Sequence, residues 1–539
     1  MDQKAIVKLC KELGCCDACA LRYIGLKNPT AYENSPQFIL KYLDQDHHAN
    51  SQTQGTDNPS DTTSTVPEEN GSDNGHTPPS KRRKVDTCIS CIGVLQPWSW
   101  DQCCEMVKEQ LDKKRYVCPT FACALSAPLA TLLREKHVTL TLSNAHPEYD
   151  PRVVTPLKEA WKWSFGEHLS RYIARPLHSG AVCPLLITVT MDYPDDLQEL
   201  EVLKTLAAPL FESRSKQKKR FTVELTRRSV EQALADVSLP SLAACWRPPP
   251  TAGTLSCASV MCAHAPVYLA GRYIKLSRSL PQTPWLVGGV RMMESSVQEI
   301  IFQPIADLYQ MSPEDAEHRL KFISAGREDV DVRCLGDGRP FAVEIADPPR
   351  QLSAEELQRA CDEMARGGRV RVARLVRATR EDLALLKKGE EFKTKTYEAL
   401  CVKLTHSDYD ENKEGPPTVS ERDIANINTY RTTPEDCEAR VVLRQKTPIR
   451  VLHRRPLLDR TRSILQLSAR LVPGHPSLFV VRVSTEAGTY IKEWVNGELR
   501  RSRPPLGAAI AARVDILALD VATVHLDWPP APSIDNKKL

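Results

Sequence analysis

Alternating apolar residues identify the clearest strand of this chain near its C-terminus. In the segment 478–485, Phe479, Val481 and Val483 recur at every second position and therefore lie on one face of an extended strand. A second segment, 185–191, is rich in β-branched residues, as is typical of a buried strand. Strands dominate from about residue 255 onward, with helices among them, which predicts an α+β fold with a large, mostly antiparallel sheet.

Helical spacing is clearest in the segment that follows Ser353. The Ser353 side chain can cap the first turn while Glu356 reaches back, and the pattern stops at a pair of glycines, residues 367 and 368. Apolar residues recur on one face of this helix at Leu357, Ala360, Cys361 and Met364. Between residues 96 and 248, similar helical patterns alternate with strands, which predicts a separate α/β domain.

Two stretches lack the apolar residues that a core requires. Residues 47–84 are rich in Ser, Thr, Asn, Asp, Gly and Pro and are predicted to be disordered, because they cannot offset the entropy of ordering. This insert ends in a basic cluster at residues 81–84, which fits either a nuclear-import signal or a solvated run of charge. Residues 407–417 form a second polar insert.

Composition and net charge limit the classes of protein to which this chain can belong. The chain has 539 residues, and its 72 basic and 68 acidic residues nearly cancel to a net charge of +4, so any nucleic-acid surface must be a local patch. Neither a signal-peptide core near the N-terminus nor an apolar run long enough to span a bilayer is found in the sequence. We therefore expect a soluble intracellular protein whose 18 cysteines are reduced or bound to metal.

Four of the cysteines form two C-x-x-C pairs, Cys16 with Cys19 and Cys88 with Cys91. Each pair can place two thiolates on one tetrahedral ion, so together they predict one structural zinc site. The long gap between the pairs contains the predicted disordered insert, and a flexible loop adds closure entropy only logarithmically. Buried, unrelated cysteines are the alternative, since further cysteines lie nearby.

Two basic stretches are candidates for contact with a polyanion. Residues 214–220 are more typical of a solvated loop. In residues 270–278, cations recur every third position beside a tyrosine, and this pattern favours RNA contact through Arg272, Lys275 and Arg278.

The segment 326–333 places Asp329 between Arg327 and Arg333. A carboxylate flanked by arginines should stay ionised and could serve as a nucleophile, although a neutralised surface turn would have the same composition. Asp331 would share a face with Asp329 in a regular strand, so periodicity cannot choose between them. Tyr397 in a predicted strand and Lys492 at a strand-to-helix junction could converge on the same cleft.

At these residues the chain resembles the pseudouridine synthases. The segments 326–329, 395–399 and 488–492 are similar to that superfamily's catalytic-aspartate loop, its strand with a base-stacking tyrosine, and its motif with a basic partner for the aspartate. Together with the cysteine pairs and the segments 271–273, 281–285 and 447–456, they resemble the pseudouridine synthase ten family of archaeal and eukaryotic tRNA enzymes.

The resemblance implies isomerisation of uridine in the TΨC arm of tRNA, at position 54, position 55 or both, without an organic cofactor. Asp329 would act as nucleophile or base, Tyr397 would stack on the uracil, and Lys492 would pair with Asp329. At the position of Lys492 the superfamily usually has arginine. Lysine carries the same charge but lacks the planar guanidinium group that forms two parallel hydrogen bonds. The resemblance further assigns phosphate contacts to Arg327, Arg333, Arg454 and Arg455.

The predicted organisation is a zinc-knuckle module at 1–46 and 85–95, a THUMP-related RNA-binding domain at 96–250 and a pseudouridine synthase domain at 255–532. We expect a monomer in nucleus and cytoplasm that acts on tRNA. The competing hypothesis is a nuclear RNA-binding scaffold in which catalysis is secondary. A zinc-finger DNA-binding regulator has less support, because the sequence contains no His-containing finger repeat.

Overall fold

The computed structural model describes residues 2–44, 86–178, 183–216, 223–249, 255–392 and 394–529. The predicted insert at 47–84, its basic cluster and residues 217–220 of the first basic stretch lie outside these ranges. The chain divides into two compact units, Met1–His264 and Ala265–Leu539. The finer division into three domains stays a prediction.

The first unit is mostly helical around a small sheet. Its strands are β1 (Ala122–Ser126), β2 (Leu185–Asp192) and β3 (Ser256–His264), with β1 parallel and β3 antiparallel to β2. Its helices are α1 (Gln3–Glu12), α2 (Asp17–Tyr23), α3 (Pro29–Glu33), α4 (Ser35–Asp44), α5 (Asp101–Lys114), α6 (Ala130–Ala145), α7 (Leu157–Ile173), α8 (Asp196–Leu200), α9 (Val202–Leu206), α10 (Ala208–Ser215), α11 (Arg227–Leu234) and α12 (Leu239–Cys245).

Helices α5 and α7 pack against this sheet. In β2, Leu185, Ile187 and Val189 are fully buried, which confirms the strand predicted from its β-branched residues. On α7, Trp161 stacks on Phe165 with ring centroids 4.5 Å apart. The same continuous apolar cluster includes α1, α2 and the buried cysteines, so the cysteine pairs are fixed to the rest of this unit.

The second unit is organised by a ten-stranded sheet in the order β14-β11-β12-β13-β10-β15-β8-β4-β9, with β7 also paired to β8. Among the described strands of this sheet, only β8 and β15 pair in parallel, so the prediction of a mostly antiparallel sheet is confirmed. The strands are β4 (Val267–Lys275), β7 (Leu320–Ser324), β8 (Arg333–Ile345), β9 (Val370–Ala378), β10 (Lys395–Lys403), β11 (Val441–Lys446), β12 (Asp459–Leu471), β13 (Leu478–Thr485), β14 (Ser502–Arg503) and β15 (Val514–Val524). The short strands β5 (Leu286–Val287) and β6 (Val290–Arg291) form a separate hairpin.

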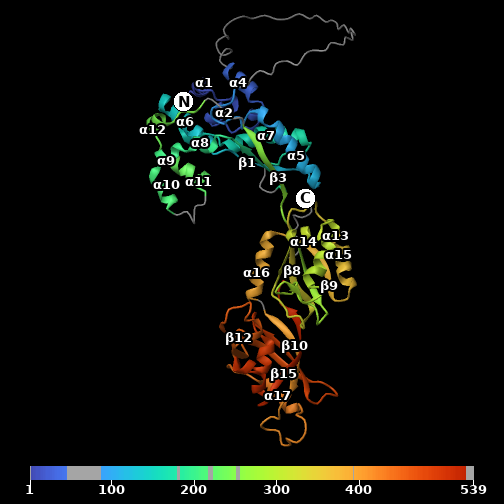
Figure 1. Ribbon diagram of the computed structural model, residues 1–539. Coiled ribbons are helices and arrows are strands. Elements are labelled where there is room, and N and C mark those ends of the chain that lie inside the picture. The colour runs from blue at the N-terminus through green and yellow to red at the C-terminus, as the bar shows by residue number, and fades with distance from the viewer. Residues whose placement is uncertain are drawn as a thin grey trace, which may run out of the picture. The chain divides into compact units, whose positions relative to one another are not determined.

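Helices cover both faces of the β4–β8–β9 part of this sheet (Figure 1). Helices α13 (Val297–Leu308) and α15 (Ala354–Arg366) pack on one face, and α16 (Arg380–Phe392) packs on the other. Helix α15 begins with the predicted capping box of Ser353 and Glu356, and all four predicted apolar residues are buried. The short α14 (Pro313–Arg319) leads into β7.

The remaining strands enclose a second core with helices α17 (Glu421–Thr429) and α18 (Ile491–Asn496). Phe479, Val481 and Val483 of β13 are fully buried in it, as their alternation predicts. The combination of helices with a mostly antiparallel sheet confirms the predicted α+β class. No helix within the described part of the chain is both long and apolar enough to cross a membrane.

Candidate functional site

A cavity of about 660 Å³ opens in the second unit where several strands and loops end. Apolar residues of β15, Leu519 and Val521, contribute to its wall beside the ring of Tyr397. Cations also line it, at Arg327, Arg339, Lys395, Arg450, Arg454, Arg455, Arg460, Arg462 and Lys492. Apart from the buried Glu328, the only carboxylate among its described lining residues is that of Asp329. An apolar wall with a cationic rim suits a ligand that combines an aromatic ring with negative charge.

Asp329 lies in a tight turn between β7 and β8. The amide of Val332 donates to the carbonyl of Asp329 at 3.2 Å, so residues 329–332 are not a regular strand. The two carboxylates therefore differ in their relation to the cavity. Asp329 lines the cavity, whereas the Asp331 side chain is 62% exposed and does not line it. This difference between the two residues was not available from their spacing.

A buried network fixes the residues that precede Asp329. The carboxylate of Glu328 accepts from the Tyr273 hydroxyl at 2.8 Å and from Nε of Arg339 at 2.7 Å. The Gln282 amide donates to that hydroxyl at 2.8 Å and to the carbonyl of Gly326 at 3.0 Å. Burial of an ion pair is compensated by such additional hydrogen bonds. The segments 271–273 and 281–285 therefore build the support of the Asp329 turn.

Lys275 supports the same turn and is fully buried. Its Nζ donates to the carbonyls of Asp329 at 3.0 Å and Val330 at 2.8 Å, and burial lowers its pKa. The prediction that Lys275 contacts RNA is therefore wrong, because its ammonium faces backbone oxygens inside the protein. The guanidinium of Arg272 likewise donates to backbone carbonyls, among them that of Val524 at 2.7 Å.

Arg278 and Arg333 share one acidic partner, Asp520 of β15. Arg333 donates to it from Nε at 2.9 Å, and Nη2 of Arg278 lies 2.7 Å from the same carboxylate. The two arginines thereby hold β8 and the loop after β4 against β15. The guanidinium groups of Arg272, Arg278 and Arg333 thus make structural contacts here, and their predicted contact with RNA stays a prediction.

Arg450 makes the shortest ion pair with Asp329 and was not among the predicted site residues. Its Nη1 lies 2.6 Å from Oδ2 of Asp329, and its Nε lies 2.6 Å from Oε1 of Glu493 on α18. Burial acts to lower the pKa of Arg450, but the hydrogen bond to Glu493 and the nearby carboxylates raise it overall. Arg450 belongs to the segment 447–456, in which the sequence offers no pattern that separates it from Arg454 and Arg455.

Lys492 reaches both acidic residues of the turn. Its Nζ lies 3.7 Å from Asp329, so the predicted ion pair is present, but its hydrogen bonds go to Asp331 at 2.8 and 2.7 Å. Although burial acts to raise the pKa of Asp331, the bonds with Lys492 hold it below its usual value. Lys492 thus contributes charge near Asp329 while Arg450 contributes the direct contact.

Tyr397 projects from β10 into the same cavity. Burial raises its pKa to about 12, so the phenol stays protonated. On the rim, Arg454 lies 3.9 Å from Asp329, and Arg327 has its pKa lowered by burial and by the neighbouring Arg454. The structure therefore brings together Asp329, Tyr397, Lys492, Arg327, Arg454 and Arg455 around one cavity.

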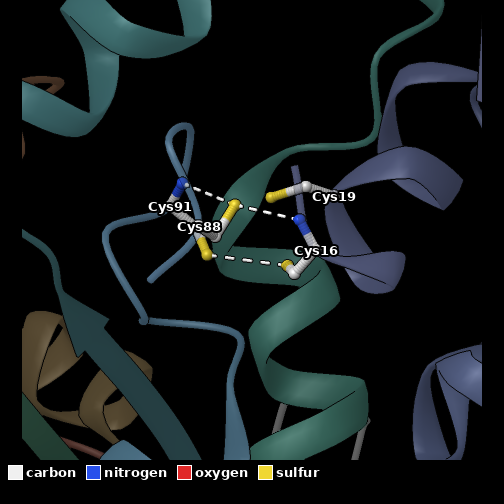
Figure 2. Close-up of side chains that lie close together, drawn as sticks. All are labelled: Cys16, Cys19, Cys88 and Cys91. Carbon is white, nitrogen blue, oxygen red and sulfur yellow. Dashed lines mark hydrogen bonds between the residues drawn. The ribbon is translucent and has the colours of Figure 1, made fainter. Parts of the chain in front are cut away.

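A second candidate site lies in the first unit, where the two C-x-x-C pairs meet (Figure 2). The sulfur atoms of Cys16, Cys19, Cys88 and Cys91 all lie within 4.8 Å of one another. Cys16 precedes α2 and Cys19 lies in its first turn, while the other two come from the turns after residue 86. The backbone amides of Cys16 and Cys91 point toward the sulfur of Cys88, at 3.2 and 3.5 Å. Four converging sulfur atoms of this kind could hold one metal ion.

Comparison with known proteins extends over both units. Residues 268–525 match the family described as "Pus10, C-terminal", and residues 88–262 match "Eukaryotic Pus10, N-terminal". The chain is 30% identical to the tRNA pseudouridine synthase Pus10 of Xenopus laevis, with 98% of each chain covered. It is 32% identical to the human protein of that name, over 84% of this chain and 80% of the human one.

Further matches each cover about half of the chain. The tRNA pseudouridine synthase Pus10 of Thermofilum pendens is 32% identical over 50% of this chain and 55% of its own length. A solved Cbf5-Nop10-Gar1 complex matches 47% of this chain and 49% of its own at 15% identity, and its TM-score of 0.24 is too low to support an argument. The two family matches and the nearly full-length relatives establish that the chain is an isomerase and belongs to the Pus10 family of tRNA pseudouridine synthases.

Proposed function

We propose that this chain isomerises uridine to pseudouridine in the TΨC arm of tRNA, at position 54, position 55 or both, with Asp329 as the catalytic carboxylate. The observation that carries the proposal is the position of Asp329 at the cavity, beside Tyr397 and within reach of three cations. A uridine from a loop must leave the stack to enter such a cavity, which costs least in a single-stranded region.

Each cavity residue has a step that suits its chemistry. The ring of Tyr397 replaces a neighbouring base by stacking on the uracil. The Asp329 carboxylate begins cleavage of the N-glycosidic bond, either by attack on the sugar or by removal of a sugar proton. The freed uracil turns and rejoins through C5; the proton on C5 then leaves and N1 gains one, so the product is an isomer of uridine. Arg450 orients Asp329 through its direct contact at 2.6 Å, and Lys492 adds positive charge from 3.7 Å. None of these steps requires an organic cofactor.

Arg327, Arg454 and Arg455 are the rim cations that we assign to RNA phosphates. They line the cavity, and guanidinium groups bind phosphate oxygens in a bidentate manner. For the first unit we propose RNA binding by a THUMP-related domain. The mixture of helices and strands in this unit and its match to the N-terminal Pus10 family support the proposal. The protein would act as a monomer in nucleus and cytoplasm.

For the cysteine group we propose one structural zinc ion. A tetrahedral ion with bonds to sulfur of ~2.3 Å separates its ligands by ~3.8 Å, and the sulfur atoms of Cys16 and Cys91 are 3.8 Å apart. Four thiolates leave no open position for a substrate, so the ion would stabilise the first unit and take no part in the reaction.

The competing proposal is an RNA-binding scaffold in which catalysis is secondary. The full set of Asp329, Tyr397 and a basic partner in one cavity favours an active enzyme. The deciding experiment incubates the purified full-length chain with a tRNA transcript and maps pseudouridine by chemical sequencing. Conversion of uridine in the TΨC arm supports the proposal, whereas tRNA binding without conversion supports the scaffold.

A further inference from the structure

Two arginines occupy the buried face of β12 where that strand reaches the cavity. In the register with β11, Arg462 lies opposite Leu443 and Ile464 lies opposite Val441, and these three apolar residues are fully buried. Residues 460, 462 and 464 point to one face because side chains alternate along a strand. Arg460 and Arg462 therefore continue a core-facing row of side chains into the cavity that they line.

Neither arginine has an acidic partner among the residues that the structure describes, since no ion pair joins them to a carboxylate. Nη1 of Arg462 donates to the carbonyl of Thr461 at 2.9 Å, but its Nε is buried and has no hydrogen-bond partner. Arg444 on the neighbouring strand, by contrast, pairs with Asp459 at 3.0 Å. A buried N–H without an acceptor is unfavourable, so the guanidinium of Arg462 is suited to an acceptor from outside the protein.

Gly488 lies beside one edge of this guanidinium. It has a φ of +78°, and a Cβ added to it would lie 3.4 Å from both Nε and Nη2 of Arg462. That point faces the two parallel N–H groups of one guanidinium edge, which is where a phosphate oxygen pair binds. Any residue other than glycine would place its side chain against this edge. The positive φ favours glycine at this position.

We propose that Arg462, with Arg460 beside it, binds a backbone phosphate of the nucleotide next to the target uridine. The inference rests on the proposed function, because it assumes that an RNA strand enters this cavity. Arg462 differs from Arg450 in what its guanidinium contacts: Arg450 is held by Asp329 and Glu493, whereas Arg462 lines the cavity without an ion pair to any described carboxylate. It is therefore a substrate-binding residue, and its loss should weaken RNA binding rather than the chemical step.

The test compares Arg462→Gln with Arg470→Gln, which removes the same charge from an exposed position on the same strand. With tRNA, we expect Arg462→Gln to raise Kd and KM by about 10-fold and to leave kcat within about twofold. The slope of log Kd against log salt should fall by about 0.7 to 0.9, as expected for one lost phosphate contact. Arg462→Lys keeps the charge without the fork and should be intermediate. If Arg462→Gln and Arg470→Gln bind alike, the subsite is overturned.

A measurement on the RNA keeps the test decisive if Arg462→Gln folds poorly. Methylphosphonate is placed singly at each phosphate that flanks the target uridine, and affinity is measured for the wild-type chain and for Arg462→Lys. Methylphosphonate at one of these positions should weaken RNA binding by the wild-type chain about 10-fold and RNA binding by the Lys variant by less. No effect at any flanking phosphate overturns the subsite while turnover persists. If the wild-type chain does not convert uridine at all, the proposed function fails and the subsite fails with it.

Discussion

Arg450 is the cation nearest to Asp329, with Nη1 2.6 Å from Oδ2, compared with 3.7 Å for Nζ of Lys492 and 3.9 Å for Nη2 of Arg454. Arg450 is itself fixed by Glu493, whose side chain is only 8% exposed. Glu493 thus orients Arg450, and Arg450 in turn holds the proposed catalytic carboxylate of Asp329. Its geometry depends on a loop and a helix far from it in the sequence.

Replacement of Asp329 by asparagine should reduce turnover at least ~1,000-fold, because the amide can neither attack the sugar nor remove its proton. The amide still accepts a hydrogen bond from Arg450, so affinity for tRNA should change little. The matched control is Asp331→Asn, which removes a carboxylate that lies outside the cavity lining. Single-turnover assays and tRNA binding separate the two effects. If Asp331→Asn were the inactive variant and Asp329→Asn retained turnover, the catalytic assignment would be wrong.

Loss of the Arg450 guanidinium should slow the chemical step. We expect Arg450→Met to lower kcat by about 100-fold, since a catalytic group displaced by about 1 Å can lose that much. Glu493→Gln should lower kcat by about 10-fold, and the double variant should be no slower than Arg450→Met, because Glu493 acts through Arg450. Additive losses would contradict this chain of contacts.

A neighbouring glutamate provides the control for this cycle. Oε1 of Glu498 accepts from the amide of Ile449 at 2.7 Å and so holds the same turn as Arg450 without contacting its guanidinium. Glu498→Gln keeps an oxygen at that position, and its kcat should stay within about twofold of wild type. An equal loss in Glu498→Gln and Glu493→Gln would mean that only the stability of the turn matters.

How far the sequence predicts this site depends on the range of the interaction. Alternation and capping are local, so β13 and helix α15 follow directly from residues 478–485 and 353–368. Asp329 could be selected because its motif is contiguous. Arg450 and Asp329 are 121 positions apart, and no local pattern links them. Lys275 was misassigned because spacing reports the periodicity of a cation but not whether its ammonium is buried.

The ring of Tyr397 should contribute more to kcat/KM than its hydroxyl. Burial raises the pKa of Tyr397 to about 12, and the hydroxyl makes no hydrogen bond within the described residues. Tyr397→Phe should therefore retain kcat/KM within about threefold, whereas Tyr397→Ala should lose 10- to 100-fold, roughly the value of one stacked base. Thermal unfolding of both variants is the control for packing. A large loss in a well-folded Tyr397→Phe would assign a role to the hydroxyl and contradict stacking as the main contribution.

The cysteine group should hold one zinc ion per chain, measured by elemental analysis of the purified protein. Cys88→Ser removes one of four thiolates and should lose the metal and lower the melting temperature, because the binding free energy of a structural ion contributes to folding. Cys123→Ser is the matched control, since Cys123 is 4% exposed in the same apolar cluster but lies outside the group. It should keep one zinc per chain. A wild-type protein without stoichiometric metal, or equal metal loss in both variants, would refute this site.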